Sequence, residues 1–286
     1  MQVTPPPLRA SSLIRALCLG AASLASAHLL LGQASVGVAL GGSTYFGDLA
    51  PASPLEHLRH LGPSYGAFFR APLAERLRVR VFVQRGRISG DDARRESTRA
   101  RNLSFASDIT EVGAGVEAHA RWGALRPYVF GGVSVYRFGP RTAFEGEPVD
   151  LQPLGTEGQG SPGYPEPYAL TRVALPLAAG VELALSDQVA VGVETGSRAT
   201  FFDHLDDVSG AYPDPAALGG EQARLRRELA DRRVGPAGEP LRAEAGGNRG
   251  DASDNDWFGT ATVTVTYTFA EREVDEREPV VPCYEF

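Results

Sequence analysis

The sequence predicts an all-β fold, an eight-stranded antiparallel up-and-down transmembrane β-barrel with short periplasmic turns and long outer loops. Three observations support this prediction. Eight segments alternate apolar and polar residues, short and long links between them alternate strictly, and one segment is longer than a soluble strand needs. Barrel strands average out in hydropathy. A hydrophobic content of 43% and a charged content of 22% therefore do not exclude a membrane protein.

The N-terminal residues have the layout of a secretory signal. Arg9 and Arg15 supply a positive region, residues 16–31 form an uncharged apolar run, and small residues follow. Cleavage is expected after Ala34, with Ala27 as the alternative. Because the apolar run is short for a membrane-spanning helix, we expect residues 1–34 to be removed as a signal peptide.

The chain that follows this signal is acidic and contains one cysteine. Loss of two arginines changes the net charge from −7 to −9, which argues against nucleic acid as a partner. Cys283 is then alone, so no internal disulfide is expected. A closed, hydrogen-bonded barrel is one alternative source of stability.

The last predicted strand, residues 257–269, has the clearest pattern. Its even positions from 260 to 268 are all threonine, and its odd positions are small or apolar. At ~3.3 Å per residue and ~40° of tilt, Trp257 and Tyr267 lie roughly 25 Å apart along the membrane normal. This is the height of an apolar band between two aromatic girdles, to which we assign Trp257, Tyr267 and Phe269. A long strand of a soluble sandwich is the alternative.

Seven further segments alternate in the same way. In chain order they span residues 36–42, 65–71, 76–83, 111–120, 128–138, 174–185 and 189–194. Both faces of segment 128–138 carry apolar residues, so the pattern leaves its inward side open.

The links between these segments determine the predicted topology. Links near 72–75, 123–125 and 186–188 are short, whereas those at about 45–62, 87–102, 139–169 and 203–256 are long. An up-and-down barrel places all long loops at one end, and an even strand number places both termini at the other. In the longest loop, the spacing of Leu225, Leu229 and Ala230 predicts a short amphipathic helix within 221–233, which either covers the barrel or folds on itself.

Several blocks at the loop borders resemble a known family. The blocks are Gly41-Gly-Ser-Thr-Tyr-Phe-Gly-Asp-Leu49, Gly86-Arg-Ile-Ser-Gly-Asp-Asp92, Arg101-Asn-Leu-Ser-Phe105, Pro127-Tyr-Val-Phe-Gly-Gly-Val133, Leu151-Gln-Pro-Leu-Gly-Thr-Glu-Gly-Gln-Gly160, Phe201-Phe-Asp-His-Leu-Asp-Asp-Val-Ser209 and Asp256-Trp-Phe258. They are similar to motifs of the PorG-like outer-membrane barrels of Bacteroidetes, a family linked to the type IX secretion system.

This resemblance spans essentially the whole mature chain. It implies an integral outer-membrane barrel that tethers periplasmic secretion-ring proteins, with outer-membrane lipid as its other partner. The chain departs from the family at Cys283-Tyr-Glu-Phe286, where Cys-Pro-Lys-Phe is common, and at His204, where tyrosine is usual. A stand-alone structural or adhesion barrel and a lipid-modifying enzyme are the alternatives.

Charges of both signs are predicted inside the barrel. An eight-stranded barrel is only wide enough for its own side chains, and an unpaired buried charge costs several kcal/mol. Charged residues should therefore pair and plug the interior. The predicted lumen network is Arg70, Arg78, Arg80, Glu111, Glu117, Glu182, Glu194 and Arg198. Arg78 and Arg80 are expected to pair with Glu111 or Glu117 on the next strand.

No cofactor and no enzymatic activity are predicted. Four histidines lack metal-ligand spacing: His57, His60, His119 and His204. A weak calcium candidate consists of Asp203, Asp206, Asp207 and Asp214, for which capping of a turn is the simpler interpretation. The tripeptide Arg249-Gly-Asp251 is interpreted as a chance match to an integrin-type motif.

The barrel domain is expected to span residues 35–270, and residues 271–286 are expected to form a periplasmic tail. Residues 271–278 are too charged to pack a core, and Pro279 and Pro282 favour an extended course. Either this tail is a frayed terminus or its apolar end docks a partner. The docking residues would be Val280, Val281, Cys283, Tyr284 and Phe286.

Overall fold

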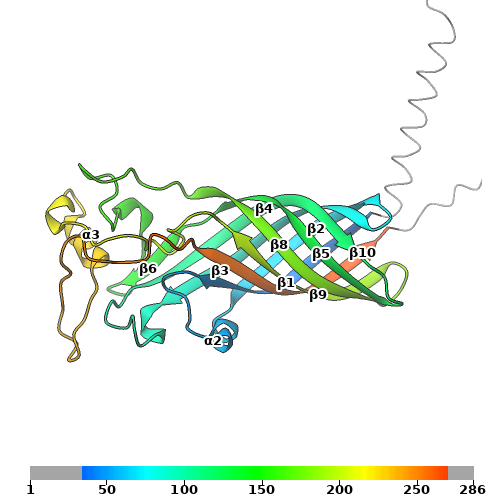
Figure 1. The fold of residues 1–286 in the computed structure, drawn as a ribbon, viewed down its shortest axis with the longest axis horizontal. Helices are drawn as coiled ribbons and strands as arrows, with labels where there is room; N and C mark the ends of the chain where they lie inside the picture. Colours follow the sequence, from blue (N-terminus) through cyan, green and yellow to red (C-terminus); the bar gives the residue numbers. More distant parts are fainter. Residues whose placement is uncertain (1–33, 270–286) are drawn as a thin grey trace, which may run out of the picture.

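The computed structural model describes residues 34–269, which form a closed barrel with a folded head at one end (Figure 1). The barrel strands are β1 (Ser35–Phe46), β2 (Gly62–Ala74), β3 (Leu77–Asp91), β4 (Ser104–His119), β5 (Leu125–Arg137), β8 (Thr171–Ala184), β9 (Val189–Ala199) and β10 (Trp257–Thr268). Each pairs antiparallel with the next, and β10 pairs with β1 from Ser35↔Thr268 to Phe46↔Trp257. The predicted eight-stranded up-and-down barrel is therefore confirmed.

The two faces of the barrel wall follow the period-2 pattern of the strands. On β10 the threonines Thr260, Thr262, Thr264 and Thr266 are buried inside, whereas Val263 and Val265 are exposed outside. On β5 the pattern left the direction open, and the structure turns Tyr128, Phe130 and Tyr136 inward. Small outward residues such as Gly131 then complete the outer wall of that strand.

A continuous apolar band surrounds the outside of the barrel. Its exposed side chains include Val38, Val81, Val112, Val133, Leu177, Val193 and Val265, which come from seven different strands. Soluble monomers rarely expose contiguous apolar patches larger than a few hundred Å². A ring of apolar side chains on a closed barrel is the surface that faces lipid, so this barrel is of the membrane-spanning class.

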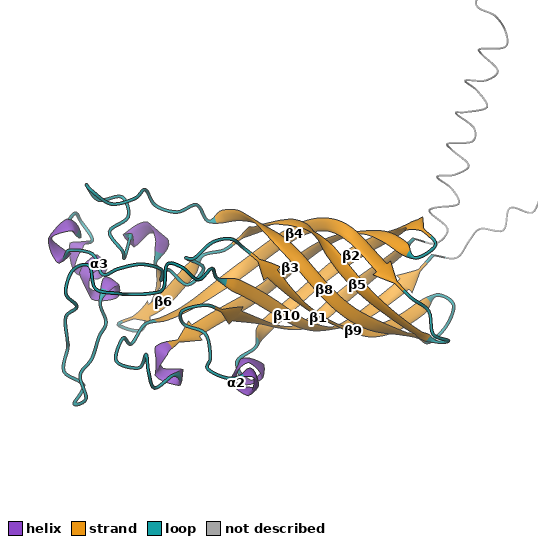
Figure 2. Cartoon of the chain, in the orientation of Figure 1, coloured by secondary structure: helices purple, strands orange, loops and turns teal. Residues whose placement is uncertain are grey.

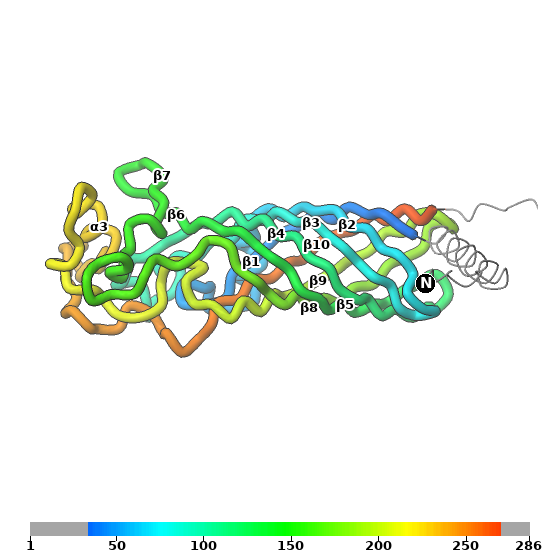
Figure 3. Tube along the Cα trace, turned by 90° about the horizontal axis from the view of Figure 1, so that it is seen from above, coloured from blue at the N-terminus to red at the C-terminus, as the bar shows by residue number. Residues whose placement is uncertain are grey.

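Short and long connections lie at opposite ends of the barrel (Figure 2). The links at 75–76, 120–124 and 185–188 are tight turns. The start of β1 and the end of β10 lie at this same end, side by side in Figure 3, because Ser35 pairs with Thr268. Residues 1–33 of the predicted signal peptide and the whole predicted tail, 271–286, lie outside the described residues.

The long connections contain more regular structure than predicted. β3 and β4 stay paired out to Asp91↔Ser104, so the predicted loop start at 87 was wrong. The predicted loop 139–169 contains a hairpin of β6 (Pro140–Phe144) and β7 (Glu147–Asp150), and β6 pairs with β4 beyond the end of β5. Ile88, Phe105 and Ile109 are buried in the head, which explains why the strands continue past the apolar band.

The head contains short helices and its own hydrophobic core. Its helical segments are α2 (Pro54–Arg59), α3 (Ala223–Ala230) and the 3₁₀ turns η1 (Asp92–Arg94), η2 (Gln152–Leu154) and η3 (Pro215–Ala217). None of the helices within residues 34–269 has the length and apolar character needed to cross a membrane. The predicted amphipathic helix is confirmed as α3, since Leu229 belongs to the hydrophobic core of the head and Leu225 packs against that core. α3 therefore does not fold only on itself but packs on the head.

Candidate functional site

The structure brings all eight predicted lumen charges together inside the barrel. Arg70 on β2 is completely buried, with Nε 2.9 Å from Glu117 Oε2 and Nη1 2.5 Å from Glu182 Oε1. Its guanidinium also lies over the Phe68 ring, 4.3 Å from the centroid. Arg70 on β2 thus bridges Glu117 on β4 and Glu182 on β8, and β8 lies across the lumen from β2.

A second group of the lumen network centres on Arg80. It forms an ion pair with Glu194 on β9, and Tyr128 Oη donates a hydrogen bond of 2.8 Å to the same carboxylate. The guanidinium lies between aromatic rings, 4.6 Å from the centroid of Phe68 and 5.0 Å from that of Phe130. Contacts between a desolvated guanidinium and ring faces are favourable, so aromatic packing and charge pairing support one another here.

The third group lies closest to the head. Arg198 Nε is 3.0 Å from Glu111 Oε2, and the same guanidinium donates to Gln84 Oε1 at 2.9 Å and to Thr260 Oγ1 at 2.8 Å. With four arginines and four glutamates, the network is formally neutral. Seven of these side chains are buried and Arg78 is 14% exposed, so the network fills the lumen of the described barrel.

The predicted pairing scheme was only partly correct. Arg78 pairs with Glu117 on the neighbouring strand, as expected. Arg80 instead pairs mainly with Glu194, and its distance to Glu117 is 3.8 Å. Adjacency along the chain identifies partners on neighbouring strands only, whereas a narrow lumen brings opposite strands within side-chain reach.

The head contains a pair of buried carboxyl groups, Asp206 and Asp256, of which the sequence singled out only Asp206. Tyr45 Oη lies 2.7 Å from Asp206 Oδ2 and 2.5 Å from Asp256 Oδ1. One hydroxyl donates a single proton, so the second close contact requires a proton on a carboxyl. Burial raises the pKa of Asp256 to about 8, with the charges of Asp203 and Asp48 contributing, and burial also raises the pKa of Asp206. One carboxyl group of the Asp206–Asp256 pair is therefore expected to carry a proton near neutral pH.

A neighbouring cluster connects the head loops through Glu157 and Arg249. Arg249 is only 3% exposed, and its Nη1 lies 2.9 Å from Glu157 Oε1. Burial alone would raise the pKa of Glu157, but a hydrogen bond from His204 and the charge of Arg249 lower it to about 2. Because Arg249 is buried, the tripeptide 249–251 is not presented for recognition.

The structure does not bring the four aspartates of the calcium hypothesis into one metal-ligand group, and three of them are engaged in other hydrogen bonds. Asp206 accepts from Tyr45, Asp207 accepts from Thr156 and Tyr168, and Asp214 caps η3 through Ala216 N. Within residues 34–269 no group of three His, Cys, Asp or Glu side chains is arranged to hold a metal ion. These carboxyl groups instead accept hydrogen bonds that fix the loops.

The predicted girdle residues are all exposed on the outside of the barrel. Trp257 lies at the head end of β10, and Tyr267 and Phe269 lie at the opposite end with ring centroids 5.7 Å apart. The predicted docking residues of the tail, 280–286, lie outside the described part of the chain.

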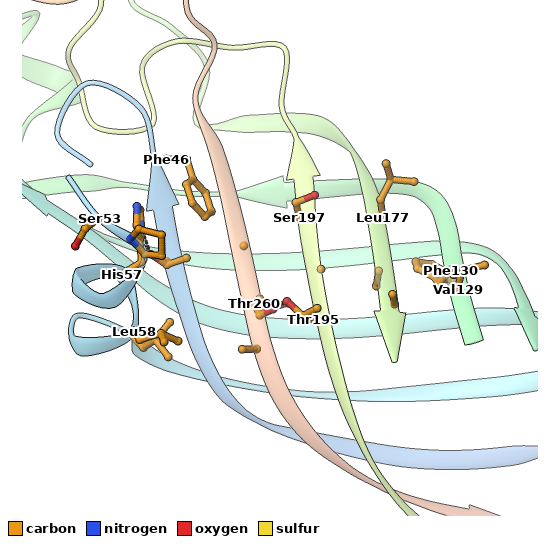
Figure 4. Close-up of a pocket in the computed structure, with 18 of the residues that line it drawn as sticks. Phe46, Ser53, His57, Leu58, Val129, Phe130, Leu177, Thr195, Ser197 and Thr260 are labelled. Atoms are coloured by element: carbon orange, nitrogen blue, oxygen red, sulfur yellow. Dashed lines mark hydrogen bonds between the residues drawn. The ribbon is translucent and has the colours of Figure 1, made fainter. Parts of the chain in front are cut away.

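A groove of about 920 Å³ runs along the outer wall beside α2, and sequence reasoning missed it (Figure 4). His57 of α2 is fixed there, because its Nδ1 lies 2.8 Å from Thr44 Oγ1 and its ring stacks on Phe46 at 4.6 Å. Small residues such as Ala261 and Thr195 line the wall opposite. The outward-facing small residues were visible in the sequence, but nothing there indicated that α2 folds back against the wall.

These features define the chain as a membrane-spanning eight-stranded β-barrel with a plugged lumen and a folded head. No family model matches the chain, and neither does any curated protein. Among solved structures it is similar to Neisserial surface protein A, NspA, with 12% identity over 82% of this chain and 97% of that chain and a TM-score of 0.42.

Two further solved structures are similar at the same level. Ail, the attachment invasion locus protein of Yersinia pestis, in complex with the heparin analogue sucrose octasulfate, has 10% identity, covers 83% of this chain and 99% of its own, and has a TM-score of 0.40. A major outer membrane protein from Thermus thermophilus has 13% identity, coverage of 83% and 98%, and a TM-score of 0.37.

Proposed function

We propose that this chain is a structural barrel of a bacterial outer membrane that anchors periplasmic components of a protein secretion apparatus of the type IX kind. The main support for a structural role is that side chains fill the lumen. Eight paired charges and the rings of Phe68, Phe82 and Phe130 fill the interior, so the barrel suits rigid anchoring better than conduction.

The anchoring role is supported by the resemblance of the loop-border blocks to PorG-like barrels and by the topology. Both ends of the described chain leave the barrel at the short-turn end, which we assign to the periplasm. Residues 271–286 would then extend from the membrane into the compartment where a secretion ring lies.

Membrane location is expected to be directly measurable. The mature protein should fractionate with the outer membrane and require detergent for extraction, because the apolar band is incompatible with water. Unheated samples should migrate differently from boiled samples on a denaturing gel, since a closed barrel resists detergent until heated. Recovery of a soluble periplasmic species without detergent would contradict the proposal.

Gene deletion tests the anchoring role. Export of type IX cargo should fall in the deletion strain and recover with the full chain, whereas a chain truncated after Ala270 should insert but recover export poorly. Normal export in the deletion strain would refute anchoring while leaving the barrel class intact. If the truncated chain restores export and retains the same periplasmic partners, contact must come from the short turns instead of the tail.

A second candidate, a stand-alone structural or adhesion barrel, is favoured by the ordered head. Its loops share a hydrophobic core and the buried ion pair of Arg249 and Glu157, as a rigid recognition surface would. Normal export combined with altered surface adhesion in the deletion strain would select this candidate. Changed lipid A or phospholipid mass spectra in that strain would instead indicate a lipid-modifying enzyme.

A further inference from the structure

The outer wall changes from apolar to cationic at one height on β3, β4 and β5. Cross-strand pairing places three valines in one outward-facing row: Val83, Val112 and Val135. The next outward-facing row toward the head is Arg85, Thr110 and Arg137. Cations thus begin two residues beyond the apolar band, where lipid chains give way to headgroups.

Two more arginines extend this row into an arginine patch, defined as Arg85, Arg87, Arg137 and Arg141. The side chains of Arg85, Arg87 and Arg141 are 55%, 56% and 58% exposed, and Arg137 is also exposed. Two aspartates accompany them, so the patch retains two positive charges.

The ion pairs of the patch leave two arginines available. Arg87 Nε lies 2.8 Å from Asp108 Oδ1, and Arg141 Nε lies 2.5 Å from Asp150 Oδ1. Arg85 only approaches Asp108, at 4.0 Å. Arg137 has no ion pair with any residue between 34 and 269.

A pocket of about 370 Å³ lies between these groups. Arg85, Arg137 and Arg141 line it together with Thr110 and Gln152. The carboxylates of Asp108 and Asp150 also line it, and they pair with Arg87 and Arg141. Guanidinium groups bind phosphate through paired N–H donors, and three of them converge here on one cavity. The corresponding outward positions at the head ends of β1 and β10 are the aromatic residues Phe46 and Trp257, so the arginine row does not extend to these two strands.

We infer that the arginine patch binds the phosphate groups of phosphorylated lipids in the outer leaflet. The inference rests on the proposed outer-membrane location, with the head outside. The lipid chains would lie along the valine row while the phosphate occupies the pocket. Basic pockets at the edge of a membrane-embedded surface recognise lipid headgroups in this way.

The test uses the complete mature protein in nanodiscs of zwitterionic phosphatidylcholine. Diphosphoryl lipid A is titrated in, and lipid A from which both phosphates have been removed is the reference probe. We expect the diphosphoryl form to associate preferentially and the preference to weaken as salt rises, because charge attraction at the surface is screened. The lipids retained per protein are counted by native mass spectrometry.

The informative variant is Arg85→Gln/Arg137→Gln, which removes two cations without breaking a close ion pair. Association with diphosphoryl lipid A should weaken about thirty-fold, given the usual contribution of two basic side chains at a membrane surface. The matched control is Arg224→Gln/Arg227→Gln, which removes two exposed arginines from α3 in the head. The control should bind as the unmodified protein does, and both variants should keep heat-modifiable migration.

Each alternative result overturns the inference. Equal retention of the two lipid A forms would show that phosphate is not recognised, and an equal loss in both variants would show a general charge effect. Full competition by millimolar inorganic phosphate would identify a small-anion site instead of a lipid site. Failure of the protein to insert into nanodiscs would refute the proposed membrane location itself, which is a separate outcome.

Discussion

Replacing Arg70 by alanine should destabilise the barrel by about 3–5 kcal/mol, because removing one partner of a buried ion pair leaves an uncompensated charge. Arg70 has no exposed surface and contacts both Glu117 and Glu182. Without it, the ion pair that residues 34–269 still provide to Glu182 is that of Arg78, at 3.7 Å. The free energy of unfolding should be measured by urea titration of the mature protein in lipid vesicles.

Two comparisons separate charge from packing in this result. Arg78→Ala should cost less, because the Arg78 side chain is 14% exposed and water can reach the site. The double variant Arg70→Met/Glu182→Gln should recover part of the loss, since it removes a carboxylate together with its partner. Unfolding free energies equal to that of the unmodified protein for Arg70→Ala would mean that the lumen is hydrated. If the double variant loses as much stability as Arg70→Met and Glu182→Gln lose together when measured singly, packing and not charge dominates.

The head should lose stability as the pH rises from about 4 to about 8. The pKa of Asp256 is about 8 in the fold and roughly 4 in an unfolded chain, so between these values the folded state binds a proton that the unfolded state has released. Stability then falls with rising pH. The contribution of this proton is complete below about pH 4 and is lost as the pH passes through about 8, with an expected change on the order of several kcal/mol.

Hydrogen exchange of the backbone amides in 203–209 measures this effect, because Asp256 accepts from Leu205 N at 2.7 Å and Asp206 from Val208 N at 2.8 Å. Exchange should be slow at pH 5 and accelerate beyond the intrinsic increase by pH 9. The variant Asp206→Asn should flatten this dependence, since its amide imitates the protonated carboxyl and can donate to Tyr45 Oη. Arg224→Gln is the control, because the Arg224 side chain is exposed on α3 and pairs with Glu145, not with the carboxyl pair. A pH dependence unchanged in Asp206→Asn would contradict a proton on this pair.

Much of the barrel was predictable because strand alternation is a local property of the chain. Val79, Val81 and Val83 face outward and Arg80 inward as their spacing requires. A barrel of eight strands is also narrow, so the strand number implied that side chains fill the lumen. The β6–β7 hairpin and the extensions of β3 and β4 were not predicted. These segments are rich in glycine, proline and charged residues, and their composition therefore resembles that of a loop.

The sequence by itself determined the number of membrane strands, the end at which each loop lies and the residues that enter the lumen. These follow from period-2 alternation and link length, which involve only neighbouring positions. The tertiary structure decided which charges meet, since Arg80 reaches Glu194 and Arg198 reaches Glu111 only after the sheet closes. It also decided that Tyr45, Asp206 and Asp256 share one site. Their positions in the chain are up to 211 residues apart, and only the folding of separate loops onto one barrel mouth brings them within hydrogen-bond distance.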